Sequence, residues 1–125
     1  MIKQVKSSDI KNFIKDNTDV ELLDVRTQEE WNSVGKPDGE KLGFKTHFVT
    51  IVKSPDPSAN KVFVEEVKKK IDPHKQLLII CKAGGRSMMA AQLLSQENIR
   101  CVNISDGFEG NGENLGWKLE GLPSK

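Results

Sequence analysis

One stretch constrains the fold more than any other: the apolar residues 77–80 run directly into Cys81, and a glycine-rich loop follows. A short apolar run that ends at Gly-Gly is typical of a buried strand, and the residues from Ser87 onward have the pattern of a helix. We therefore predict a strand over 77–80, a tight loop after it and a helix over 87–96. This arrangement places a thiol between the end of a strand and the start of a helix.

Three features of the loop favour the thiolate form of Cys81. The backbone amides of residues 82–87 can point at the sulfur, and the start of the following helix adds about half a positive charge. Lys82 and Arg86 also place two cations within five residues of the sulfur.

A cysteine packed as a small hydrophobe is the alternative interpretation of Cys81, since free cysteines are often buried. Gly84 and Gly85 argue against it, because glycine is costly at such a position unless the backbone needs a positive φ or a close approach. The pattern favours a reactive Cys81 over a packed one.

Composition and length bound the class of protein. The 125 residues predict a single domain over 1–125, and 36% hydrophobic with 30% charged residues is ordinary for a globular chain. A net charge of +1 gives no sign of nucleic-acid or membrane binding. No apolar run approaches the ~20 residues needed to cross a bilayer, and the first residues lack a signal-peptide core. Two cysteines in unlike contexts predict no disulfide framework, so we expect a reducing, cytoplasmic location.

Predicted strands and helices alternate along the rest of the chain. Thr27 is predicted to cap a short helix, with Glu30 at the capping-box position. Alternation requires crossover connections, which indicates an α/β fold with a mainly parallel sheet and helices on both faces. The expected strands cover residues 2–5, 20–25, 47–51, 77–80 and 101–104; the expected helices begin near residues 9, 28, 62 and 87, and residues 54–58 are expected to be a loop.

The carboxyl edge of this sheet is where we expect the site, because ligands of such sheets bind beyond the carboxyl ends of the strands. Cys81 follows one strand there, and Asp24 and Arg26 lie at the same end of another. We interpret Asp24 and Arg26 as internal hydrogen-bonding and ion-pair residues that support the site. A contact between a carboxylate and Arg86 is left open.

Three blocks of residues, in this order, point to a known family. They are Asp24-Val25-Arg26 with Glu30-Trp31, then Cys81-Lys82-Ala83-Gly84-Gly85-Arg86-Ser87, and then Gly107-Phe108-Glu109-Gly110 with Gly116-Trp117 and Gly121-Leu122-Pro123. Over nearly its whole length the chain resembles the single-domain rhodanese (thiosulfate sulfurtransferase) family. The resemblance implies a rhodanese-like fold, with a five-stranded parallel sheet flanked by helices.

The same resemblance implies an activity and a site. Cys81 would attack the outer sulfur of a donor such as thiosulfate, expel sulfite and carry the sulfur as a persulfide. The substrate-binding cradle would be made by Lys82, Ala83, Gly84, Gly85, Arg86 and Ser87. Cyanide, a thiol or a protein cysteine would then remove the sulfur, and neither a metal nor an organic cofactor is required.

Within the cradle the residues have different expected roles. We expect Arg86 to brace the loop through a carboxylate rather than to bind the donor. Lys82 is the better candidate for attracting an anion. Ser87 either hydrogen-bonds the sulfur or caps the helix.

Several other chemically suggestive residues are expected to play no part. His47 and His74 are predicted to lie too far away to act as bases, and His74 is expected to be exposed in a turn. Trp31 and Trp117 are interpreted as core anchors. Cys101 is expected to be an inert, buried thiol.

Other functions remain open beside the sulfurtransferase. A cysteine phosphatase or arsenate reductase carries five residues between cysteine and arginine, whereas four stand between Cys81 and Arg86, which argues against that class. A persulfide carrier for a protein acceptor would have the same loop, and a non-enzymatic binding module is the main alternative. The 32–44 segment departs from the commoner family pattern, and neither its role nor that of 111–114 follows from the sequence.

Overall fold

The computed structural model describes residues 2–51 and 57–125. Strands and helices alternate along these residues, as predicted. The strands are β1 (Lys3–Val5), β2 (Val20–Asp24), β3 (Thr46–Phe48), β4 (Gln76–Ile80) and β5 (Cys101–Ile104). The helices, with η marking 3-10 helices, are η1 (Ser7–Asp9), α1 (Ile10–Asp16), α2 (Gln28–Val34), η2 (Gly39–Leu42), α3 (Pro57–Lys70), α4 (Gly85–Ser95) and α5 (Gly116–Leu119).

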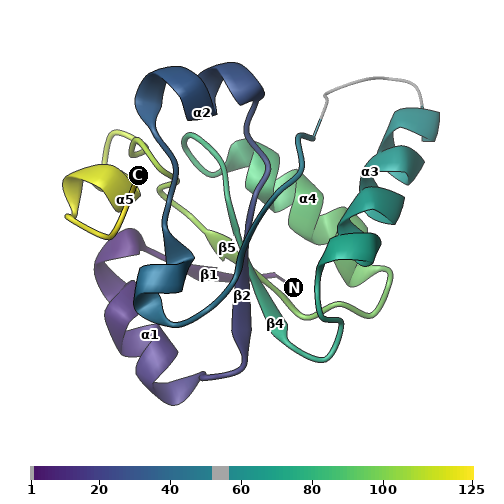
Figure 1. Ribbon diagram of the computed structural model, residues 1–125, viewed down its shortest axis with the longest axis horizontal. Helices are drawn as coiled ribbons and strands as arrows, with labels where there is room; N and C mark the ends of the chain where they lie inside the picture. The colour runs from purple at the N-terminus through teal and green to yellow at the C-terminus, as the bar shows by residue number, and fades with distance from the viewer. Residues whose placement is uncertain (1, 52–56) are drawn as a thin grey trace.

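The five strands form one sheet in the order β1-β5-β4-β2-β3, and each neighbouring pair is parallel. Figure 1 shows α1 and α5 on one side of the sheet and α3 and α4 on the other. The predicted five-stranded parallel sheet with helices on both faces is therefore confirmed. Among the described residues, no helix combines the length and apolar character needed to cross a membrane.

The central strand β4 shows why both faces of the sheet are covered. Its side chains alternate, so that Leu77 and Ile79 pack with residues of α3 and α4. Leu78 and Ile80 pack on the opposite face, with residues of α1 and with Trp117 of α5. All four are at most 1% exposed. A strand buried on both faces is a continuous apolar run, which is the pattern that the sequence shows here.

Some element boundaries differ from the prediction. The strand expected over 47–51 is β3, which ends at Phe48, although the amides of Val49 and Ile51 still donate to carbonyls of Asp24 and Val25. The helix expected from 62 begins at 57, where proline suits a first helical turn. Of the loop expected over 54–58, residues 54–56 lie outside the described residues and 57–58 belong to α3.

Candidate active site

The carboxyl ends of β2 and β4 bring the predicted site residues to one edge of the sheet. β4 ends at Ile80, Cys81 follows, and α4 begins at Gly85. The register between the strands places Asp24 opposite Ile80, so Val25 and Cys81 leave the sheet side by side and Arg26 follows one residue later. This is the edge that the sequence predicted.

The Cys81 sulfur is held inside its loop by two contacts. The Gly84 N–H donates to Sγ at 3.1 Å, and Ser87 Oγ lies 3.2 Å from Sγ. Of the amides of residues 82–87, only that of Gly84 has an acceptor within the described part of the chain. Gly84 is thus the one residue of 82–87 whose amide is seen to donate to the sulfur, and the other amides of the loop have no acceptor among the described residues.

Gly84 is the residue that lets the loop close on the sulfur. Its φ is +107°, and a Cβ there would overlap the carbonyl oxygen of Ser105. A side chain is thus excluded both by the backbone conformation and by the close approach of Ser105, the residue that follows β5. Gly85 does not share this requirement, because its φ is ordinary and a Cβ would enter open space. The expectation that both glycines are conformationally required is wrong for Gly85.

Residues 107–109, which follow β5, hold the backbone of the loop at Cys81 and Lys82. The Phe108 N–H donates to the Cys81 carbonyl at 2.8 Å, and the Glu109 N–H donates to the Lys82 carbonyl at 3.0 Å. A Cβ on Gly107, whose φ is +65°, would overlap the Lys82 carbonyl oxygen. The third sequence block therefore lies directly against the second.

Arg86 braces the loop against α2. Its guanidinium donates to both carboxylate oxygens of Glu30, at 2.8 and 2.9 Å. Glu30 also accepts from the Thr27 N–H, which completes the predicted capping box. Arg86 lowers the pKa of Glu30 from 4.5 to about 2, and Glu30 in turn raises the pKa of Arg86. The carboxylate partner of Arg86 is thus Glu30 and not Asp24.

Glu30→Gln is expected to lower the free energy of unfolding by about 1–2 kcal/mol near neutral pH, a range reduced for partial solvent screening of the pair. Because the pKa of Glu30 is lowered, its contribution is complete above pH 4.5 and is lost as the pH falls through about 2. Urea unfolding at about pH 7 and about pH 3 should therefore show a smaller difference between variant and wild type at the lower pH.

Glu29→Gln is the matched control, since Glu29 is an exposed neighbour on the same helix. Equal effects of the two substitutions, or a Glu30→Gln effect that does not shrink at low pH, would contradict the assignment of this ion pair.

Asp24 and Arg26 form the expected internal ion pair, and both are 0% exposed. Arg26 Nη2 donates to Asp24 Oδ2 at 2.9 Å, and the Arg26 N–H donates to Oδ1 at 2.9 Å. The Arg26 guanidinium also stacks over the Phe108 ring, 4.2 Å from its centroid. Because Phe108 holds the Cys81 carbonyl, the pair supports the loop indirectly.

Lys82, the candidate for attracting an anion, is exposed on the loop directly after Cys81. Neither histidine is placed to act on the Cys81 sulfur. His47 Nε2 lies 3.0 Å from Glu21 Oε1, and His74 lies exposed in the turn before β4, at the opposite end of that strand from Cys81.

The two tryptophans differ in their surroundings. Trp117 is 0% exposed, as expected for a core anchor. The same expectation is wrong for Trp31, which is only partly buried, because α2 buries none of its residues. The Trp31 ring packs edge-on against Phe48 at a centroid distance of 5.3 Å.

Cys101 is separated from the site. It pairs with Leu77 in the sheet, four residues of strand before Cys81, or roughly 13 Å. Burial raises the pKa of the Cys101 thiol to about 12. This thiol stays protonated near neutral pH, and both cysteines are free.

Two polar residues near the site were missed by the sequence interpretation. Asn103, 1% exposed in β5, has Oδ1 2.5 Å from Ser87 Oγ. Asp106, which is 0% exposed, accepts from the Ser7 N–H and the Gly116 N–H, both at 2.9 Å. A signal was present in both cases, because an Asn within a buried strand and an Asp just after it need partners.

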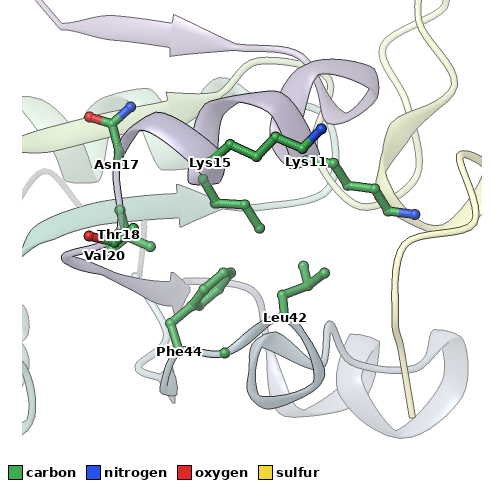
Figure 2. A pocket seen from close by; sticks show the side chains of 9 residues that line it. Lys11, Lys15, Asn17, Thr18, Val20, Leu42 and Phe44 are labelled. Atoms are coloured by element: carbon green, nitrogen blue, oxygen red, sulfur yellow. The ribbon is translucent and has the colours of Figure 1, made fainter.

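The surface hollow in Figure 2 lies away from the sulfur. It has a volume of about 420 Å³ and includes Val20, the first residue of β2, whereas Cys81 follows the carboxyl end of β4. Lys11 and Lys15 border it, and Leu42 and Phe44 form an apolar wall. Over the described residues, no group of three or more His, Cys, Asp or Glu side chains is arranged to hold a metal ion.

The comparisons with known proteins agree with this geometry. Protein RP600 of Rickettsia prowazekii is 35% identical over 124 residues, 98% of this chain and 97% of that one. An Allochromatium vinosum protein named sulfurtransferase is 26% identical over 124 residues, 98% of this chain and 94% of its own. The crystal structure of Rv0390 from M. tuberculosis has a TM-score of 0.81 at 30% identity, with 98% of this chain and 96% of that chain covered. The family model for the rhodanese-like domain matches residues 7–113. This chain belongs to the family of rhodanese-like domains.

Proposed function

We propose that this chain is a sulfurtransferase in which Cys81 carries a sulfane sulfur from a donor to a thiophilic acceptor. The donor is thiosulfate or a persulfide, and the acceptor is cyanide, a small thiol or a protein cysteine. Because the nucleophile is a cysteine that must stay outside a disulfide, the proposal places the chain in a reducing compartment such as the cytoplasm.

The reaction has two half-reactions. In the first, the Cys81 thiolate attacks the outer sulfur of thiosulfate, the sulfur–sulfur bond breaks, and sulfite leaves with the electron pair. In the second, the acceptor attacks the outer sulfur of the Cys81 persulfide. The sulfur–sulfur bond breaks, and the Cys81 thiolate is regenerated with the electron pair. A covalent intermediate between two transfers predicts ping-pong kinetics.

The observation that carries the proposal is the loop around the sulfur. The Gly84 N–H points at Sγ, while the neighbouring amides have no acceptor among the described residues. Preorganised N–H donors stabilise negative charge without rearranging, which suits the anionic outer sulfur of a persulfide. Cys81 is 1% exposed, a value that a packed cysteine would also have, so the free amides rather than the burial favour chemistry here.

Lys82 and Arg86 have different roles in this proposal. Lys82 is exposed on the loop and attracts an anionic donor. Arg86 is occupied by Glu30 and acts on the sulfur through its charge and by holding the loop. The sulfurtransferase name of the Allochromatium vinosum relative supports this activity in preference to a binding module.

The test is the intact mass of the wild-type protein after incubation with thiosulfate and, separately, with a polysulfide. The expected gain is one sulfur atom, about 32 Da, removed by a cyanide chase. Peptide mapping should locate the added sulfur on the Cys81 peptide and not on the Cys101 peptide. No gain with either donor would contradict the proposal and favour a non-enzymatic binding module, whereas a gain with polysulfide alone would assign the donor.

A further inference from the structure

A chain of polar side chains runs from the Cys81 sulfur across β5 to Gln4 on the neighbouring strand β1. Ser87 Oγ lies 3.2 Å from Cys81 Sγ and 2.5 Å from Asn103 Oδ1. Asn103 Nδ2 lies 3.3 Å from the Gly84 carbonyl oxygen and 3.2 Å from Gln4 Oε1. Ser87 and Asn103 are at most 1% exposed, so their hydrogen bonds must be satisfied within the protein.

The direction of these hydrogen bonds follows from the inventory of donors. The Gly84 carbonyl can only accept, so the amide nitrogen of Asn103 must face it and Oδ1 must face Ser87. Oδ1 can only accept as well. Ser87 Oγ also lies 3.2 Å from the Gly84 carbonyl oxygen, but Asn103 Oδ1 is the nearer acceptor. Because two lone pairs facing each other at 2.5 Å would repel, the single hydroxyl proton of Ser87 lies between its Oγ and Asn103 Oδ1.

The consequence for Cys81 is that Ser87 turns a lone pair toward the sulfur. With its proton held by Asn103, Ser87 Oγ can only accept from the Cys81 S–H, and it offers no hydrogen bond to a charged sulfur. The Gly84 N–H is then the donor that favours the thiolate. Ser87 donates to a charged sulfur only after its hydroxyl turns away from Asn103.

We infer that Asn103 is a positioning residue: it retains the Ser87 hydroxyl proton and thereby controls how much of Cys81 is reactive thiolate. This inference deepens the proposed function, since it concerns the same sulfur. It does not require sulfur transfer to be tested, because any thiol-directed reagent reports the thiolate.

The test is a double-mutant cycle with Asn103→Leu and Ser87→Ala, read out as the pH midpoint of Cys81 alkylation by iodoacetamide. Asn103→Leu removes the nearer of the two oxygen acceptors beside the Ser87 hydroxyl. The other, the Gly84 carbonyl oxygen at 3.2 Å, is neutral and competes less well than a charged sulfur, so the hydroxyl turns to the thiolate. The midpoint should fall by about half a unit to one unit, the equivalent of one hydrogen bond. In the Ser87→Ala background the same substitution should have no effect.

One further variant, Gln4→Leu, and the single variant Ser87→Ala serve as controls. Gln4→Leu removes a partner of the Asn103 amide without touching Ser87 and should leave the midpoint unchanged. If Asn103→Leu does not fold, Ser87→Ala alone decides, because an accepting Ser87 predicts a midpoint that does not rise. Arg86, whose charge interacts with Cys81, its partner Glu30 and the exposed Lys82 are unchanged in every variant.

A midpoint that rises in Asn103→Leu, stays at the wild-type value, or falls equally with and without the Ser87 hydroxyl would overturn the inference. Because no sulfur donor is present, these outcomes are independent of the mass measurement. A protein that takes up sulfur but shows no coupling would retain the proposed function and lose this role of Asn103.

Discussion

Cys81→Ser is expected to abolish persulfide formation and to reduce the rate of sulfur transfer by at least about a thousandfold. A serine hydroxyl is not ionised near neutral pH and does not take up a sulfane sulfur. Serine is the appropriate replacement because its hydroxyl can keep the contacts that the thiol makes with the Gly84 N–H and with Ser87. The measurement is thiocyanate production from thiosulfate and cyanide, together with the intact mass after exposure to the donor.

Cys101→Ser is the matched control for this prediction. Cys101 is the second free cysteine and lies beside Leu77, in the part of the sheet away from the loop. Its replacement should leave both the mass gain and the rate unchanged. Sulfur uptake that survives in Cys81→Ser and disappears in Cys101→Ser would overturn the assignment of the nucleophile.

The part of the site that could be predicted is the part that is local in the sequence. Strand, cysteine, loop and helix follow one another over 77–96, so their order and the place of Cys81 at a strand end follow from neighbouring residues. The parallel sheet adds one more piece of information, because all carboxyl ends meet at one edge. That rule was enough to bring Asp24 and Arg26 to the same edge as Cys81.

The contacts between distant residues were harder to predict. Glu30 was assigned to a capping box, and nothing local indicates that the same carboxylate also pairs with Arg86, 56 residues away. The position of α2 over the loop decides this, and it depends on packing rather than on periodicity. The partial burial of Trp31 has the same cause, because α2 lies at the rim and none of its residues is buried.

Asn103 illustrates a signal that was available and not used. It stands between Val102 and Ile104 in a strand that is otherwise apolar, and a buried amide there needs partners on both of its polar atoms. Its partners come from β1, α4 and the loop, which no single stretch of sequence joins.

Asp24→Asn is expected to lower the free energy of unfolding by about 3–5 kcal/mol. Asp24 and Arg26 are both 0% exposed, so the variant leaves a guanidinium in the interior without a counter-charge. Arg26 has no other acidic partner in the described part of the chain. Its Nη2 donates to the neutral Gly35 carbonyl, and its Nη1 has no partner within the described residues. Urea unfolding measures the loss, and a lower sulfur-transfer rate should accompany it through Phe108, which stacks on Arg26 and holds the Cys81 carbonyl.

Two comparisons separate the buried charge from a general effect of losing a carboxylate. Asp19 pairs with Arg100 at 3.1 Å, but both side chains are more than half exposed, so Asp19→Asn should leave the urea midpoint unchanged. The double variant Asp24→Leu with Arg26→Met removes both charges and should recover most of the stability lost in Asp24→Asn. A double variant as unstable as Asp24→Asn would contradict this account, because the cost would then come from lost shape and hydrogen bonds rather than from an unpaired charge.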